Sequence, residues 1–92
     1  MKNLNQQMIN AILDCDIEKA NNIIQNDDFD INYQDDSGNG FLHYAYTDFY
    51  FYGHMKMVLW LFEKRAPYNI KNINGHLPNF LFSKFCNYVS KP

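Results

Sequence analysis

Hydrophobic residues recur at helical spacing in several separate segments of the chain. In residues 4–13 the apolar positions follow an i, i+4, i+5, i+8, i+9 pattern, which places them on one stripe of a helix. Residues 17–24 and 55–62 carry comparable stripes, and two further apolar segments, residues 41–52 and 77–88, each begin behind a turn. The pattern therefore predicts five helices and an all-α fold.

Polar residues separate these segments in a repeating order. Asp16 is placed to cap the helix at 17–24, and Pro67 stops the helix at 55–62 because proline cannot continue a helix. Residues 29–34 and 68–70 are predicted to be extended, and residues 35–40 and 72–75 are predicted turns. The predicted unit is helix, break, helix, extended arm and turn, and it occurs about two and a half times, with a period typical of ankyrin arrays.

The sequence of this unit resembles the ankyrin repeat family. The segment DDSGNGFLHYA, residues 35–45, is similar to the opening D-x-x-G-x-T-P-L-H-x-A, with matches at Asp35, Gly38, Leu42, His43 and Ala45. The segment GHMKMVLWLFEKRAPYNIKN, residues 53–72, resembles the second half of a repeat, with matches at Gly53, His54, Val58, Leu61, Ala66 and Asn69. Residues 11–35 resemble that half again, and residues 72–82 resemble a third opening. The resemblance covers nearly the whole chain and is most specific in the middle repeat.

The resemblance implies an ankyrin-repeat solenoid of helix–turn–helix units joined by short extended arms. A single domain, residues 1–92, would comprise an N-terminal repeat or cap at 1–34, a central repeat at 35–71 and a C-terminal half-repeat cap at 72–92. Such units stack because none can bury its own apolar face. Arg65 lies where the family has a left-handed glycine, which implies strain or a rearranged helix end.

The central repeat carries four residues more than the family pattern, and all four are aromatic: Phe49, Tyr50, Phe51 and Tyr52. Four consecutive rings cannot all point inward from a helix, so at least one or two must face solvent or a partner. Two interpretations remain open. The rings form an interface patch, since tyrosine is enriched in binding hot spots, or they cover the open end of a short stack.

Composition places the chain among small globular proteins. It has 92 residues, of which 47% are hydrophobic and 20% charged. No apolar run approaches the roughly 20 residues that span a bilayer, and the N-terminus lacks the apolar core of a signal peptide, so we expect a cytoplasmic protein without a membrane partner. Cys15 and Cys86 have no close partner in sequence, which favours two reduced thiols over a disulfide.

Charge is unevenly distributed along the sequence. Residues 1–50 hold nine acidic residues and two lysines, for a net charge of −7, whereas residues 51–92 have a net charge of +5. An acidic half can steer a basic partner, although segregated solvated charges remain the simpler alternative. A basic strip of four residues argues only weakly for nucleic-acid binding in an acidic domain: Lys56, Lys64, Arg65 and Lys71.

The sequence contains no motif for catalysis, a cofactor or a metal. G-x-S-x-G, P-loop and H-E-x-x-H patterns are missing, and His43, His54 and His76 lack the spacing of metal ligands. The resemblance implies instead that His43 hydrogen-bonds the backbone of its turn and that His54 starts a helix. For Asp35 we expect turn-stabilising bonds rather than cation binding.

These patterns together predict a non-enzymatic protein-interaction module. We expect it to inhibit or neutralise another protein with a basic surface, as an immunity protein does for a toxin. The alternative is a self-associating structural subunit that assembles head to tail. The predicted partner surface follows the turns and the helix at 41–52 and comprises Tyr33, Asp35, Asp36, Asn39, Tyr44, Asp48, Phe49, Tyr50, Tyr52, Asn72 and Asn74.

Overall fold

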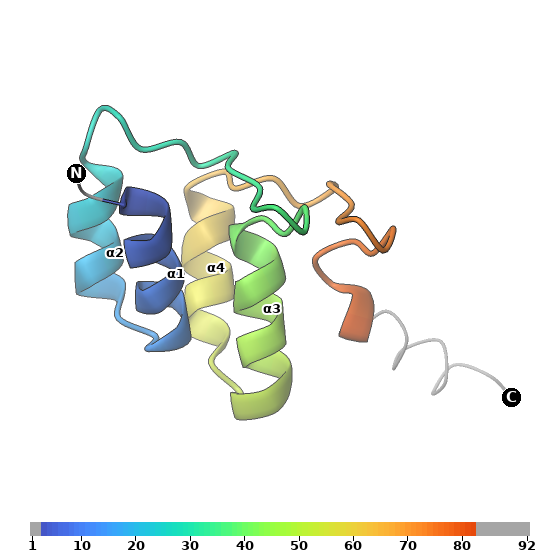
Figure 1. Ribbon diagram of the computed structural model, residues 1–92. Helices are drawn as coiled ribbons and strands as arrows, with labels where there is room; N and C mark the ends of the chain where they lie inside the picture. The colour runs from blue at the N-terminus through green and yellow to red at the C-terminus, as the bar shows by residue number, and fades with distance from the viewer. Residues whose placement is uncertain (1–2, 83–92) are drawn as a thin grey trace, which may run out of the picture.

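The structure, a computed structural model, describes residues 3–82 and is all-α, with no strand in that range. Four helices lie wholly within these described residues: α1 (Leu4–Leu13), α2 (Ile17–Ile24), α3 (Phe41–Tyr52) and α4 (Met55–Glu63) (Figure 1). They lie where the sequence predicts them. The fifth predicted helix, at 77–88, starts later than expected, because Leu77 and Pro78 belong to a turn and helical structure resumes at Phe80. Residues 83–88 of that prediction lie outside the described residues.

The helices form two pairs that lie side by side. Helix α1 packs against both α2 and α3, and α3 packs against α4 (Figure 1). Trp60 on α4 donates its indole N–H to Oδ1 of Asn21 on α2 at 3.0 Å, which connects the second helices of the two pairs. The core between the pairs consists mainly of aliphatic and sulfur-containing side chains, among them Met8, Ile12, Ala20, Leu42, Met57 and Leu61.

One predicted apolar stripe is divided by the fold. The sequence groups the apolar residues of 55–62 on one face, but the structure buries Met57, Val58 and Leu61 and leaves Met55, Leu59 and Phe62 exposed. Helix α4 is therefore apolar on two opposite sides. The exposed side contacts the rest of the domain mainly through Phe62, whose ring meets those of Tyr46 and Tyr68.

Local signals set the helix ends. Oδ1 of Asp16 accepts the backbone N–H of Lys19 at 3.0 Å, which confirms the predicted cap of α2. Helices α1 and α4 are each followed, two residues after their last helical residue, by a left-handed residue, Cys15 (φ 53°) or Arg65 (φ 64°). Arg65 thus adopts the conformation that glycine has in the ankyrin pattern, and the predicted strain is confirmed by its positive φ.

The two turns that follow the arms have the same hydrogen-bonded structure. The first arm, predicted to be extended over 29–34, itself contains a turn, in which the backbone N–H of Tyr33 donates to the carbonyl oxygen of Asp30 at 3.2 Å. In the turn at 35–39, the backbone N–H of Asp35 donates to the carbonyl oxygen of Asn39 at 3.0 Å. In the turn at 72–76, Asn72 and His76 make the same bond at 3.0 Å. Each turn also has a left-handed glycine, Gly38 or Gly75, whose N–H donates to the first residue of its turn. The spacing between equivalent residues is 37 throughout.

The side chains that begin these turns are equivalent as well. Oδ1 of Asp35 accepts the backbone N–H groups of Ser37 and Asn39, both at 2.9 Å. Oδ1 of Asn72 accepts those of Asn74 and His76, both at 3.0 Å. Aspartate and asparagine are therefore equivalent at this position, because the turn needs only a side-chain Oδ1 that accepts these N–H groups.

Candidate partner-binding surface

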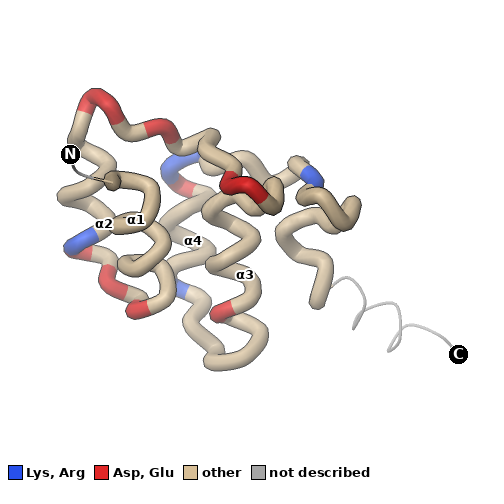
Figure 2. The backbone as a smooth tube through the Cα atoms, viewed as in Figure 1, with Lys and Arg blue, Asp and Glu red and all other residues tan. Residues whose placement is uncertain are grey.

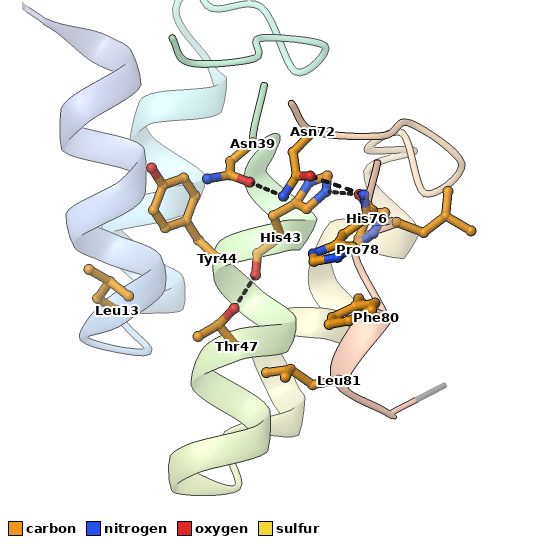
Figure 3. A pocket seen from close by; sticks show the side chains of 11 residues that line it. Leu13, Asn39, His43, Tyr44, Thr47, Asn72, His76, Pro78, Phe80 and Leu81 are labelled. Atoms are coloured by element: carbon orange, nitrogen blue, oxygen red, sulfur yellow. Dashed lines mark hydrogen bonds between the residues drawn. The ribbon is translucent and has the colours of Figure 1, made fainter. Parts of the chain in front are cut away.

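The turns position a cavity of about 460 Å³ beside α3 (Figure 3). Helix α3 contributes three lining residues, His43, Tyr44 and Thr47. The remaining lining residues come from the end of α1, the two turns and the segment that follows them: Leu13, Asn39, Asn72, His76, Leu77, Pro78, Phe80 and Leu81. The volume lies within the range of ordinary ligand pockets, and the walls combine apolar side chains with a few amide and hydroxyl groups.

His43 fastens α3 to both turns. Its Nδ1 accepts the backbone N–H of Gly40 at 3.0 Å, so the ring proton is on Nε2, which donates to the carbonyl oxygen of His76 at 2.9 Å. The side chain is buried and uses both nitrogens. This confirms that His43 hydrogen-bonds the backbone of the turn, and it leaves neither nitrogen free for a ligand.

Asp35 and Tyr44 form a hydrogen-bonded pair at the edge of the cavity. The hydroxyl of Tyr44 donates to Oδ2 of Asp35. Burial alone would raise the pKa of Asp35, but the hydrogen bonds from Tyr44, Asn39 and Ser37 outweigh it and lower that pKa below 3.8. Burial, reinforced by the bond to Asp35, raises the pKa of Tyr44 to about 12. The turn-stabilising bonds expected of Asp35 are therefore confirmed.

Two asparagines connect the turns above the cavity. The amide N–H of Asn72 donates to Oδ1 of Asn39 at 2.9 Å (Figure 3). Beside it, the backbone N–H of Ile73 donates to the carbonyl oxygen of Ser37 at 2.9 Å. Both asparagines were predicted to contact a partner. Part of their hydrogen-bonding capacity is used inside the domain, although both still line the cavity.

The other predicted residues of the turns differ in exposure. Asp36 and Asn74 are exposed, as a partner surface requires. Tyr33 is half-buried and packs its ring against Phe41, with the ring centroids 5.8 Å apart. The turns thus expose their tips to solvent, whereas Tyr33, in the arm before the first turn, packs toward the core.

The aromatic insert is divided between packing and exposure. Phe49 is half-buried and stacks on Phe82 at 4.7 Å, and Tyr50 meets the same ring edge-on at 5.6 Å. Phe51 and Tyr52 are 65% and 73% exposed. The prediction that at least one or two rings face outward is confirmed. The insert covers part of the stack and also presents free rings at the end of α3.

The prediction that Asp48 lies on the partner surface is wrong. Its side chain is only 3% exposed, and Oδ2 is 2.7 Å from Nδ1 of His54. The turn at Gly53, where φ is 78°, reverses the chain after the aromatic insert and brings His54 over Asp48. A buried carboxylate needs such a partner, so this pair holds the α3–α4 connection together.

Sequence reasoning missed several residues of the cavity. Thr47 is exposed, and its hydroxyl donates to the carbonyl oxygen of His43 one helical turn earlier at 2.8 Å. Together with Tyr44 and Phe51 it follows an i, i+3, i+7 pattern, which places all three on one face of α3. That spacing was visible in the sequence. Leu13 and Leu77 line the same cavity because of packing between distant segments, which the sequence does not show.

Within residues 3–82, no group of three or more histidine, cysteine or acidic side chains is arranged to hold a metal ion. In the same part of the chain, no helix has the length and apolar character needed to cross a bilayer. Cys15 is half-buried, while Cys86 lies outside the described residues. No protein-family model matches the chain, and a search of curated proteins found no match either.

Proposed function

We propose that this protein is a non-enzymatic interaction module of the ankyrin type, which binds another protein along α3 and the turn tips. The cavity beside α3 is the observation that carries this proposal. Its walls hold Tyr44, Thr47 and two asparagines next to apolar surface, a mixture that suits a protein side chain with a polar end.

The repeated turns support the ankyrin assignment. Two turns with the same bonds, 37 residues apart, are joined side by side through Asn39 and Asn72, and each is attached to a helix pair. This is the arrangement expected of a stacked repeat, in which each unit contacts its neighbour in sequence. The proposed domain therefore remains a short array, with its C-terminal half-repeat extending beyond the described residues.

Charge indicates the chemistry of the partner. Acidic residues follow the arm between α2 and α3 and the turn after it, whereas the residues that line the cavity carry no acidic, lysine or arginine side chain (Figure 2). An apolar cavity beside an acidic rim suits a partner that inserts an apolar or aromatic residue flanked by lysine or arginine. Such a surface is typical of enzymes that act on nucleic acid. We therefore favour a neutralising role, such as that of an immunity protein toward a nuclease toxin.

Substitution of Thr47 by arginine tests this surface. Thr47 is exposed on α3, so the larger side chain would fill the cavity mouth without entering the core. We expect Thr47→Arg to weaken partner binding by at least about 2 kcal/mol, roughly 30-fold, as for a central contact. The measurement is affinity capture from the native host, followed by titration of the captured protein.

The matched control is Asn22→Arg, which adds the same side chain at an exposed position of α2. A partner held by wild type and by Asn22→Arg but lost by Thr47→Arg supports the proposal. Equal capture by both variants, or capture of nothing by wild type, contradicts it.

A further inference from the structure

Helix α4 has an apolar stripe that the described domain leaves largely exposed, although the Phe62 ring touches those of Tyr46 and Tyr68. Met55, Leu59 and Phe62 are 49%, 56% and 40% exposed and follow i, i+4, i+7 spacing. The other side of the same helix supplies Met57, Val58 and Leu61 to the core. A helix that is apolar on both sides is typical of one buried between two neighbours, so the stripe is suited to receive a second helix.

Opposite charges border this stripe on one side. Lys56 and Glu63 are seven residues apart, which places them on the same side of the helix two turns from each other. A shallow hollow of about 260 Å³ lies between them and is lined also by Ile17, Leu59 and Trp60. Glu63 makes a single long contact, 3.9 Å from Nζ of Lys64, while Lys64 lies over the ring of Trp60. Lys56 and Glu63 are thus available to a partner.

We propose that a second copy of this chain docks on α4, with the two α4 helices antiparallel and a two-fold axis beside Leu59. In a two-fold interface, residue i of one copy meets residue j of the other, and j meets i. Leu59 then meets Leu59, and Met55 meets Phe62. In an antiparallel pair, the same side of the stripe on both helices comes together on one side of the interface. The charged sides of the two copies therefore meet, and Lys56 of each copy faces Glu63 of the other.

The charge pattern selects this occupant and this orientation. In a parallel two-fold pair the charged flanks of the two helices lie on opposite sides of the interface, so Lys56 and Glu63 would have no opposite charge to face. An antiparallel pair of identical helices satisfies all four charges at once. One helix face is a small interface, so we expect a dimer with a dissociation constant of about 1–100 μM.

This self-association differs from a head-to-tail assembly and does not depend on the proposed function. The cavity is lined from α1, α3, the turns and the segment after them, whereas the dimer uses the solvent face of α4. Both cavities remain open in the dimer. A dimer with two open cavities can bind two partner molecules, or two sites on one oligomeric partner, with avidity about 10² to 10⁴ times the single-site affinity.

Sedimentation equilibrium of the full chain, from about 5 μM to about 1 mM, tests the dimer. Wild type should change from monomer to dimer across this range, and Leu59→Glu should remain monomeric throughout. Leu13→Glu is the matched control, because it introduces the same charge at an exposed leucine away from α4. Circular dichroism verifies that each variant folds. A wild-type chain that stays monomeric, or a control that dissociates as fully as Leu59→Glu, overturns the proposal.

Charge reversal tests the orientation. Lys56→Glu and Glu63→Lys should each weaken the dimer about tenfold or more. The double variant should recover wild-type association, and a mixture of the two single variants should form a heterodimer because every facing pair is again opposite. Failure of both the double variant and the mixture to associate rules out the antiparallel arrangement.

Discussion

The side-chain amide of Asn72 donates to Oδ1 of Asn39 at 2.9 Å, across 33 residues of sequence. This bond joins the last residue of one turn to the first residue of the next, and the internal hydrogen bonds of the two turns are the same. Turn stacking and helix packing therefore hold neighbouring units together at separate levels of the fold. The turn level also forms one wall of the cavity, so stability and the proposed binding surface share residues.

Substituting the two left-handed glycines separates the contribution of turn stacking to stability from the cost of backbone strain. A Cβ on Gly38 would lie 2.9 Å from the Cα of Asn72, whereas nothing among the described residues lies within 4 Å of a Cβ on Gly75. Both have nearly the same φ, 78° and 77°. We expect Gly75→Ala to lower the free energy of unfolding by about 1–2 kcal/mol through strain alone. Gly38→Ala should cost about 1–3 kcal/mol more, since the next turn must move.

Urea denaturation of both glycine variants measures this difference. Similar losses for the two would mean that the turns do not press on each other in solution, and the stacked arrangement would then be wrong.

Arg65→Gly should stabilise the protein. Arg65 is exposed and has φ 64°, a conformation that glycine adopts without the steric cost of a Cβ. We expect the free energy of unfolding to rise by about 0.5–1 kcal/mol, after allowance for the greater flexibility of the unfolded chain. Arg65→Ala is the control: it removes the same side chain but keeps the Cβ, so it should not stabilise. Thermal unfolding of both variants measures the change in stability. If Arg65→Ala stabilises the protein as much as Arg65→Gly, the effect comes from removing the charge and not from the backbone conformation.

The Asp35–Tyr44 pair should make stability depend on alkaline pH. The folded protein raises the pKa of Tyr44 to about 12, from a usual value of 10.0, so it keeps a proton that the unfolded chain has already lost. Unfolding therefore becomes more favourable as pH rises from about 10 to about 12. Tyr44→Phe lacks this proton, and its stability should decline less over the same interval. Urea denaturation at about pH 9 and about pH 11.5 measures the difference.

Tyr33→Phe is the control for this comparison, as it removes a hydroxyl from another half-buried ring near the core. It should follow wild type. The acid side has the opposite sign: Asp35 has a lowered pKa, so its stabilisation is present above about pH 4 and is lost as pH falls through its folded pKa. Parallel behaviour of Tyr44→Phe and Tyr33→Phe would show that the Asp35 bond does not form.

The aromatic insert should show two separate effects. Phe49 stacks on Phe82, so Phe49→Ser should lower the free energy of unfolding by about 2–4 kcal/mol. Phe51 is largely exposed, and Phe51→Ser should change stability by no more than about 0.5 kcal/mol. If Phe51 contacts the partner, its serine variant should instead weaken binding. Loss of stability in both variants would assign the whole insert to covering the stack.

Helix positions were predictable because local signals define them. Asp16 caps α2 and Gly53 ends α3, and both signals are visible in the sequence. The start of the helix predicted at 77–88 was misplaced because proline also fits the first turn of a helix, whereas Pro78 lies before the helix that begins at Phe80.

The surface was harder to predict because exposure depends on contacts between distant segments. Asp48 looked like a free carboxylate until the chain reversal at Gly53 placed His54 against it. Asp35 and Asn39 would be polar turn residues whether they bind a partner or hydrogen-bond within the domain. Only the structure shows how many of their hydrogen bonds are made within the domain. Leu59 shares an apolar period with Val58 and Leu61, so periodicity alone could not separate the buried side of α4 from its exposed side.

The outer side of Gly75 has a practical consequence for protein engineering. The turn at 72–76 packs against the side of Gly38 where a Cβ would be. On the same side of Gly75, nothing in residues 3–82 lies within 4 Å of that position. A duplicated block of residues 35–71, inserted after residue 71, would repeat the backbone donors and acceptors between turns in register, and Asp35→Asn in the inserted copy would also supply the amide that donates to Asn39. The chain is therefore a starting point for building scaffolds of chosen length.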